Sequence, residues 1–158
     1  MSKPTKEELH ELYDYIDGSL YHKKRKQRIQ PGQKAGTIDH YGYVAIHLNH
    51  KKYKEHHLVW AYHYDMYPGM LDHIDGNKTN NQIHNLRIAT PSQNQMNRKI
   101  NKNNKTGVKG LYFRNNRWLA IIKFNKNRVG KSFKDKEEAI QFIHTTRSKL
   151  HGDFARFQ

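Results

Sequence analysis

An aspartate followed directly by a histidine stands near the middle of the chain, at Asp72 and His73. Neighbouring residues of an extended strand point to opposite faces, so the carboxylate could hold a metal ion while the imidazole addresses a water molecule from another side. Carboxylate and amide oxygens suit Mg²⁺ or Mn²⁺ better than Zn²⁺. One histidine base and one hard divalent cation would supply an activated water, a neutralised phosphate charge and a stabilised leaving oxygen, which phosphodiester hydrolysis requires.

Two other metal sites fit this stretch less well. The run 75–77 (Asp-Gly-Asn) has the composition of an EF-hand loop. With its glycine in the EF-hand glycine position, however, the first ligand would be Leu71 and the closing acidic residue would be Gln82. A zinc site built on His73 and His84 would lack companion ligands, because the chain contains no cysteine.

The charge of the chain points to a polyanionic partner. There are 29 Lys and Arg against 14 Asp and Glu, a formal net charge of +15. Such a chain repels itself unless it meets a polyanion, which makes nucleic acid the leading partner class. Ribosomal and other RNA-binding proteins share this balance and stay open as an alternative. Disorder is disfavoured, because 2 Trp, 10 Tyr and 6 Phe lie within patterned segments.

Composition also restricts the location of the protein. The absence of cysteine excludes disulfides and thiolate zinc ribbons. No apolar run approaches the roughly 20 residues that a membrane helix needs, and the N-terminal residues lack the apolar core of a secretory signal. We therefore expect a protein of the cytoplasm, without membrane association.

Local patterns predict the elements that precede and follow the Asp-His pair. Thr5 and Glu8 have the spacing of a capping box, and a helix is expected from there to Ile16. Alternating residues between 36 and 50 predict strands, with a turn at Asn49-His50, and a second helix is expected over residues 56–64.

A further helix is predicted after the Asn-rich stretch that follows His73. Thr90 and Gln93 form a second capping box, and Pro91 occupies the first helical position. Asn94 is therefore expected in the first turn of this helix.

Charge and pattern change after residue 98. Residues 1–98 hold 14 Lys and Arg against 10 Asp and Glu, a net of +4, whereas residues 99–158 hold 15 against 4, a net of +11. The segment 99–105 is polar and basic without a periodic apolar face, which is typical of a linker. Most of the affinity for a polyanion is expected in the residues beyond it.

The residues after this linker predict three antiparallel strands and a helix. The strands are expected over 108–113, 118–124 and 128–133, separated by Asn-rich turns at 115–116 and 125–127. Asp135 and Glu138 have capping-box spacing, and the helix is expected to end near Gly152. Period-two alternation places one set of residues against this helix: Trp118, Ala120 and Ile122, opposite Phe142 and Leu150.

The motif residues together resemble the phage-type HNH homing endonucleases. The resemblance is carried by Leu71-Asp72-His73-Ile74-Asp75-Gly76-Asn77, Asn80-Asn81, Asn85-Leu86-Arg87, Thr90 and Asn94. The upstream run 56–60 (His-His-Leu-Val-Trp) is similar to the family's His-Arg-Leu-x-Trp, with His57 in place of Arg. The resemblance implies an α+β protein with a ββα-metal fold, in which a two-stranded turn and a helix hold one cation.

Residue roles follow from the same resemblance. His73 is expected to be the general base, and Asp72 and Asn94 are expected to bind Mg²⁺ or Mn²⁺. Asn85 is expected to orient the His73 ring through a hydrogen bond. His56 matches a family position at which we expect contact with a phosphate.

Residues 106–157 resemble the AP2 type of DNA-binding domain, a three-stranded antiparallel sheet packed on one helix. The matching runs are 109–111 (Lys-Gly-Leu), 117–122 (Arg-Trp-Leu-Ala-Ile-Ile) and 149–155 (Lys-Leu-His-Gly-Asp-Phe-Ala). A basic sheet of this kind could enter the major groove of double-stranded DNA. The expected DNA-binding residues are Lys109, Tyr112, Arg114, Arg117, Lys123 and Arg128, with Leu119 and Ile121 on the same outward face.

The domain organisation expected is a nuclease domain over 1–98 with its core at 56–98, a linker over 99–105 and an AP2-like domain over 106–158. The two resemblances imply a site-specific homing endonuclease of a phage or mobile element. With one such site, a monomer would nick one strand, whereas a homodimer could cut both, and no protein partner is evident. The alternative is a non-catalytic DNA-binding or regulatory protein on the same scaffold.

Overall fold

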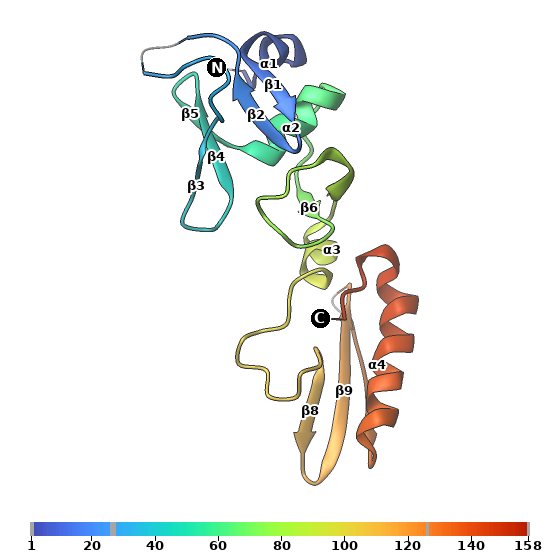
Figure 1. Cartoon of the computed structure of the whole chain (residues 1–158). Coiled ribbons are helices and arrows are strands. Elements are labelled where there is room, and N and C mark those ends of the chain that lie inside the picture. Colours follow the sequence, from blue (N-terminus) through green and yellow to red (C-terminus); the bar gives the residue numbers. More distant parts are fainter. Residues whose placement is uncertain (1, 26–27, 126, 158) are drawn as a thin grey trace. The chain divides into compact units, whose positions relative to one another are not determined.

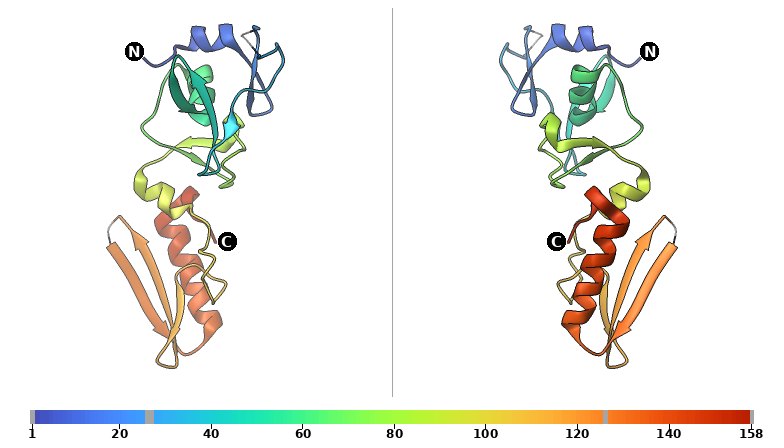
Figure 2. Two further views of the ribbon diagram at one scale, coloured as in Figure 1. Left: turned by 90° about the vertical axis from the view of Figure 1, so that its left-hand side faces the viewer. Right: turned by 90° about the vertical axis from the view of Figure 1, so that its right-hand side faces the viewer.

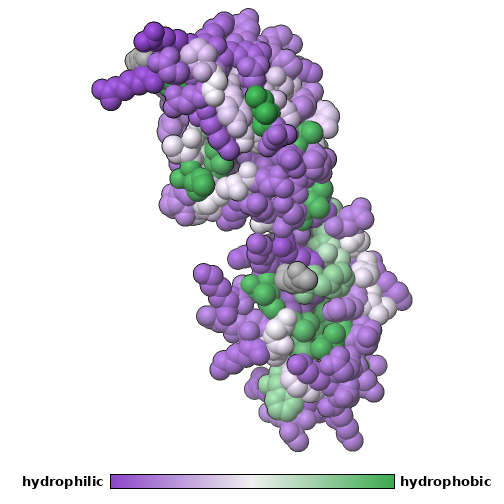
Figure 3. Space-filling view, viewed as in Figure 1, coloured by the Kyte–Doolittle hydropathy of each residue, from purple (hydrophilic) through white to green (hydrophobic). Residues whose placement is uncertain are grey.

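The computed structural model describes residues 2–25, 28–125 and 127–157. It is a mixed α+β chain that divides into two compact units, Met1–Ile88 and Ala89–Gln158 (Figure 1). None of the helices in this described part of the chain combines the length and the apolar character that a membrane crossing requires. On the face drawn in Figure 3, hydrophilic residues cover most of each unit, in keeping with a mean hydropathy of −1.08.

The first helix is shorter than its sequence pattern predicts. Helix α1 (Lys6–Leu12) begins at the capping box of Thr5 and Glu8, as expected, but it ends four residues before Ile16. Strand β1 (Tyr13–Ile16) instead pairs antiparallel with β2 (Ser19–His22).

The Asp17-Gly18 turn explains the early end of α1. Both residues adopt positive φ angles, 46° and 82°. Two consecutive positive φ angles form the two-residue turn that matches the twist of a β-hairpin, and Asp-Gly is a preferred pair for it. The hairpin therefore prevails over the helical spacing of the apolar residues before it.

A three-stranded sheet and a helix follow. The sheet order is β3-β4-β5, formed by Thr37–Ile38, Val44–Leu48 and Lys51–Lys54. The predicted turn at Asn49-His50 is confirmed, with φ angles of 50° and 61°. Helix α2 (Glu55–Tyr64) begins one residue before its predicted start, directly after β5.

The Asp-His pair lies in a small hairpin at the end of the first unit. Strand β6 (Leu71–His73) pairs antiparallel with β7 (Leu86–Ile88), and the 3₁₀ helix η1 (Ile83–Asn85) precedes β7. The core that supports this hairpin draws on α1, β1, β2, β4, α2 and β7. Its buried members include Leu9, Tyr13, Leu20, Ile46, Leu58, Val59 and Leu86.

The second unit opens with the predicted Asn94 helix and continues with a sheet. Helix α3 (Pro91–Met96) has Thr90 as its N-cap, with both capping-box hydrogen bonds present and Pro91 at the first helical position. The sheet order is β10-β9-β8, formed by Asn127–Phe133, Arg117–Phe124 and Leu111–Arg114. The 3₁₀ helix η2 (Gly152–Phe154) ends the regular structure.

One face of this sheet carries a helix, as the alternation predicted. Helix α4 (Lys136–His151) begins at Asp135, whose side chain accepts the N–H of Glu138, and lies along the strands (Figure 2). Of the expected contact residues, Ala120 and Ile122 are buried in the core, and Trp118, Phe142 and Leu150 are partly buried around it. Lys126, in the middle of the turn predicted at 125–127, lies outside the described residues.

The boundary between the units differs from the predicted domain boundary. The compact units meet between Ile88 and Ala89, ten residues before residue 98. The ammonium group of Lys109 donates hydrogen bonds to the carbonyls that close α3, those of Gln95, Met96 and Arg98. These bonds group α3 with the second unit.

The predicted linker also has internal order. Residues 99–105 contain no helix or strand. Near their end, however, Asn104 Oδ1 accepts hydrogen bonds from the backbone N–H groups of Thr106 and Gly107. The segment is thereby an irregular loop of the second unit.

Candidate active site

Strand β6 positions the Asp-His pair. Its register places Asp72 opposite Arg87 and His73 opposite Leu86, and all three of its residues are buried. Consecutive residues of a strand point to opposite faces. The carboxylate and the imidazole are therefore presented in different directions from one rigid element.

The Asp72 carboxylate is fixed across the hairpin by a guanidinium group. Nε and Nη2 of Arg87 donate to Oδ2 of Asp72 at 3.0 and 2.9 Å. Both side chains are shielded, with 6% of the Asp72 and 15% of the Arg87 side chain exposed. Charge-assisted hydrogen bonds of this kind are stronger than neutral ones, so the direction of the carboxylate is set by β7.

A hydrogen-bonded cluster of polar side chains around Asp75 fixes the loop between β6 and η1. Asn85 donates from Nδ2 to Asp75 Oδ1 at 3.0 Å and to the carbonyl of Asn80 at 2.8 Å, while its Oδ1 accepts the N–H of Asp75. Burial alone would raise the pKa of the Asp75 carboxyl, but hydrogen bonds from Asn77, Asn80 and Asn85 outweigh it and lower that pKa.

The expectation that Asn85 orients the His73 ring through a hydrogen bond is therefore corrected. Both polar atoms of its side chain are used to close the loop. Asn85 shapes the turn that follows His73, and its backbone carbonyl accepts the N–H of Ile74.

The ring of His73 has a different partner. Its Nε2 lies 2.8 Å from Oδ1 of Asn81, and Nδ2 of Asn81 donates to Oε2 of Glu55 at 2.7 Å. The sequence pattern included Asn81 without a role and missed Glu55. The only available signal was an acidic residue at the start of a helix that is otherwise apolar and aromatic.

Burial sets the protonation state of His73. Burial lowers the pKa of its imidazole, and the hydrogen bond with Asn81 and the nearby carboxylates of Asp75 and Asp72 offset only part of this. The ring is therefore neutral near pH 7, the state in which an imidazole can accept a proton.

His56 packs against the His73 ring from helix α2. The ring centroids lie 4.9 Å apart in a T-shaped arrangement. Burial, with the neighbouring His57 and His73 rings, lowers the pKa of His56 to about 2. Within the described residues, its buried Nδ1 has no hydrogen-bond partner. The His56 ring is thus neutral and would bring no positive charge to the phosphate contact expected of it.

Two exposed lysines lie over the ring of Tyr43, next to the site. The Nζ atoms of Lys54 and Lys78 lie 4.1 and 4.7 Å from the centroid of the Tyr43 ring. That ring lies 6.2 Å from the His73 ring and 5.4 Å from the His56 ring. Neither lysine was singled out by the sequence patterns, because they stand 24 residues apart in the chain.

The donor atoms proposed for a metal ion fit a hard cation in kind. Asp72, in the first unit, offers carboxylate oxygen, and Asn94, in the first turn of α3 in the second unit, offers amide oxygen. Across residues 2–25, 28–125 and 127–157, no group of three or more His, Asp or Glu side chains is arranged around a common point.

The outward face of the second unit's sheet carries the predicted basic residues. Strand register pairs Arg114 with Arg117 and Lys123 with Arg128, and all four side chains are exposed. Tyr112 stands opposite Leu119 on the same face. The juxtaposition of these residues is as predicted.

Lys109 does not belong to this basic face. Its ammonium group is directed to three backbone carbonyls at the end of α3, the shortest at 2.8 Å. Burial, together with the nearby charges of Arg147, Arg98 and Arg156, lowers its pKa to about 8. The expectation that Lys109 binds DNA is corrected to a structural role within the second unit.

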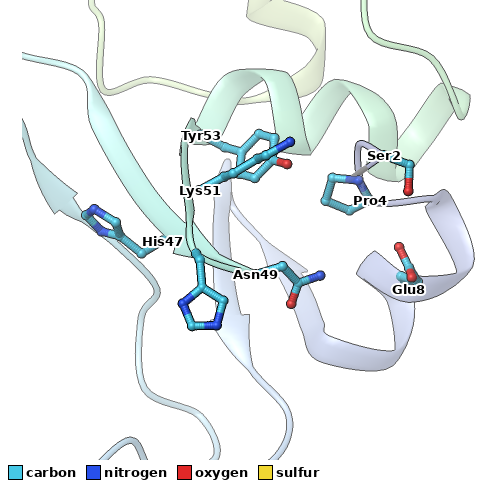
Figure 4. A pocket seen from close by; sticks show the side chains of 8 residues that line it. Ser2, Pro4, Glu8, His47, Asn49, Lys51 and Tyr53 are labelled. Atoms are coloured by element: carbon cyan, nitrogen blue, oxygen red, sulfur yellow. The ribbon is translucent and has the colours of Figure 1, made fainter.

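A pocket in the first unit contains none of the predicted site residues. The N-terminal segment and α1 line one side of it with Ser2, Pro4 and Glu8, and the β4–β5 hairpin lines the other (Figure 4). The candidate active site is therefore described by its polar contacts.

Comparison with known proteins finds a family match over one segment of the chain. Residues 53–96 match the HNH endonuclease family. This segment runs from β5 to α3 and contains five of the predicted residues: His56, Asp72, His73, Asn85 and Asn94.

Three relatives come from viruses and a prophage. Protein 3.8 of Escherichia phage T7 is 39% identical over 90 residues, 56% of this chain and 74% of the phage protein. An uncharacterized HNH endonuclease of Acanthamoeba polyphaga mimivirus is 39% identical over 85 residues, 54% of this chain and 44% of that protein. The third relative is YosQ, an SPbeta prophage-derived protein of Bacillus subtilis strain 168 whose name describes it as an HNH homing endonuclease. It is 44% identical over 66 residues, which are 37% of this chain and 38% of YosQ.

The chain thus spans about three quarters of the T7 protein and less than half of the other two. No solved structure matches it.

Proposed function

This chain belongs to the HNH endonuclease family, and we propose that it hydrolyses a phosphodiester bond of double-stranded DNA with His73 as the general base. The observation that carries the proposal is the buried His73 ring, which lies on the same strand as the Asp72 carboxylate and is held by a hydrogen bond with Asn81. All three residues lie in the segment that matches the family.

The proposed reaction transfers one proton to His73. The neutral ring takes a proton from a water molecule, whose oxygen attacks the phosphorus in line with the departing 3′ oxygen. The P–O3′ bond breaks, and the 3′ oxygen takes a proton from solvent, which leaves 5′-phosphate and 3′-hydroxyl ends. Asp72 and Asn94 would hold Mg²⁺ or Mn²⁺. When bound, the cation supplies positive charge to the phosphate and to the leaving oxygen.

The positive side chains near His73 support DNA as the substrate. Lys54 and Lys78 bring two exposed ammonium groups to the Tyr43 ring next to the base. Such groups neutralise backbone phosphates without regard to sequence. We infer that they hold the strand that is cut.

Selection of a target site is assigned to the sheet of the second unit. Its outward face combines guanidinium groups with apolar side chains, a combination that can contact guanine edges and thymine methyl groups. In this proposal the face acts as an AP2-like reader, and the enzyme is of the homing type, encoded by a phage or mobile element. A monomer would nick one strand.

One observation favours the non-catalytic alternative, a DNA-binding or regulatory protein. Arg87 already occupies Oδ2 of Asp72, so a cation and this guanidinium group would share one carboxylate. A chain that binds DNA but holds no cation would be expected to keep this ion pair.

A plasmid library with a randomised segment tests the proposal, because the target sequence need not be known. The full chain is incubated with supercoiled library DNA and Mg²⁺ or Mn²⁺, with and without a chelator, and the ends formed are sequenced and their phosphates assigned. Cleavage that needs the cation, leaves 5′-phosphates and is lost in Asp72→Ala is expected. The exposed Asp14→Ala, which also loses an ion pair, is the matched control. Binding without cleavage in either cation would overturn the proposal in favour of the alternative.

A further inference from the structure

A chain of buried polar groups connects the start of helix α2 to the His73 ring. Glu55, the first residue of α2, accepts the N–H of Leu20 on Oε1 at 2.9 Å and the amide of Asn81 on Oε2 at 2.7 Å. Asn81 in turn places Oδ1 2.8 Å from Nε2 of His73. Glu55 and Asn81 are 0% and 1% exposed, so water does not compete for either side chain.

The direction of each hydrogen bond follows from the groups that can only donate or only accept. A backbone N–H can only donate, so Oε1 of Glu55 accepts from Leu20. The second carboxylate oxygen also accepts, which turns the NH₂ group of Asn81 toward Glu55 and its carbonyl toward the ring. A carbonyl can only accept, so the facing Nε2 of His73 must carry a proton. The neutral ring then has its lone pair on Nδ1.

We propose that Glu55 is a positioning residue for the cleavage reaction: through Asn81 it keeps the proton of His73 on Nε2 and makes Nδ1 the proton-accepting atom. This inference rests on the proposed function, because it concerns the base of that reaction. Glu55 itself touches no reacting atom, and neither the family match nor the sequence patterns assign it a role.

A purely structural residue at this position would not need a charge. Burial raises the pKa of the Glu55 carboxyl, and the hydrogen bonds from Leu20 and Asn81 offset part of that effect. A buried carboxylate is costly even when it is paired, and an apolar residue of similar volume is often as stable or more so. The carboxylate adds two hydrogen-bond acceptors. One of them binds the backbone N–H of Leu20, which can only donate. The other acceptor fixes the Asn81 amide with its NH₂ group toward Glu55.

The substitution Glu55→Gln is nearly isosteric and should reverse the whole chain of hydrogen bonds. Glutamine has one acceptor and one donor, and the N–H of Leu20 takes the acceptor. Its NH₂ group then faces Asn81, which must present its carbonyl to Gln and its own NH₂ group to the ring. Nε2 of His73 would become the acceptor, and the proton would move to Nδ1.

The experiment measures the ¹⁵N chemical shifts of the His73 ring in the full chain at neutral pH, together with single-turnover cleavage and DNA affinity. We expect a protonated Nε2 in the wild type and a protonated Nδ1 in Glu55→Gln. The cleavage rate of the variant should fall by about 100-fold, the scale of a lost general base, with the Kd for DNA unchanged. Glu11→Gln, an exposed carboxylate on α1 paired with Lys24, is the matched control and should alter neither quantity.

Asn81→Ala provides a second variant if Glu55→Gln does not fold. It leaves the bond between Glu55 and Leu20 in place and should give His73 a mixture of both tautomers. Wild type and variants with the same tautomer, or a reversed tautomer with an unchanged rate, would overturn the proposal. A wild-type chain with the expected tautomer that cuts no DNA would instead overturn the proposed function, and with it the catalytic meaning of Glu55.

Discussion

At the scale of single residues, the chemistry of His73 is set by burial and by its neighbours. The ring is packed against His56 and Tyr43, bonded to Asn81 and adjacent in the chain to Asp72. Burial favours its neutral form, and a fixed partner on one nitrogen defines which atom is basic. These neighbours therefore keep the ring neutral, the form in which it can accept a proton.

The pH dependence of cleavage follows from the lowered pKa of His73. The neutral ring is the active form, and burial moves its pKa below the ordinary value of 6.5. The fraction of active base should thus stay high as pH falls to 6.5 and decline only below that value. Single-turnover rates from pH 5 to 8 at constant ionic strength, with DNA binding measured at each pH, check this. An inflection above 6.5 would contradict the burial argument.

The lysines beside Tyr43 should contribute to binding of the DNA strand. Replacing Lys54 and Lys78 together by Ala removes two phosphate contacts, which should weaken DNA binding by about tenfold and reduce the slope of log Kd against log salt by about 1.8. Lys23 and Lys24, which are each ion-paired with a carboxylate, serve as a control double substitution of equal charge. Equal losses in the two double variants would mean that only net charge matters.

Residue types at the site were predictable from sequence, but their partners were not. The Asp72-His73 pair and the spacing to Asn85 and Asn94 indicated the segment that matches the family. The path of the loop after β6 determines which of several asparagines reaches the His73 ring. The hydrogen-bonded cluster around Asp75 fixes that path. A local pattern carries no information about such a tertiary choice.

At the scale of elements, caps and turns determine where structure begins and ends. Capping residues located the start of α1, α3 and α4 correctly, because the cap satisfies backbone groups that are local in sequence. The predicted end of α1 was wrong, because the actual end depends on pairing between β1 and β2 across the Asp17-Gly18 turn. Strand β8 similarly begins at Leu111, three residues after its predicted start at Val108.

Gly110 explains the delayed start of β8 and gives a test of the second unit's packing. It adopts a φ of +83°, and a Cβ atom there would meet the carbonyl oxygen of Ile121. Gly107 has a similar φ of +73°, but a Cβ atom at that position would meet nothing within 4 Å. Both Gly→Ala variants share the backbone strain of about 1 kcal/mol, and only Gly110→Ala adds a clash.

Chemical denaturation of the two Gly→Ala variants should separate strain from clash. Gly110→Ala should lose about 1–3 kcal/mol more free energy of unfolding than Gly107→Ala, the usual cost of overpacking. A signal from Trp118, which lies on β9 next to β8, reports on the second unit. Indistinguishable midpoints would mean that β8 and β9 do not approach as closely at Gly110 as described.

At the scale of the whole molecule, charge is divided unequally along the chain. Residues 99–158 carry a net charge of +11 and residues 1–98 only +4, while the segment that matches the family ends at residue 96. The charge asymmetry and the strand pattern were both predictable. The unit boundary was not, because it depends on hydrogen bonds from Lys109 to the end of α3.

The basic face of the sheet should supply much of the salt-dependent affinity. Replacing Arg114, Lys123 and Arg128 by Ala should lower the log–log salt slope by about 2 to 3, since each phosphate that is no longer neutralised reduces it by about 0.9. A control with Lys105, Lys134 and Lys149 replaced removes the same charge from exposed positions outside that face. Equal slopes for the two triple variants would argue against the face as the DNA-binding surface.

One comparison of cleavage rates shows whether His73 is the base of a DNA-cutting site. A cleavable DNA selected from the plasmid library is saturated with wild type, His73→Ala or the exposed control His84→Ala, and single-turnover cleavage is started with Mg²⁺. We predict a loss of about 10²–10⁴-fold for His73→Ala, wild-type rates for His84→Ala and the same Kd for all three. Equal cleavage rates for wild type and His73→Ala at equal occupancy would mean that His73 is not the base.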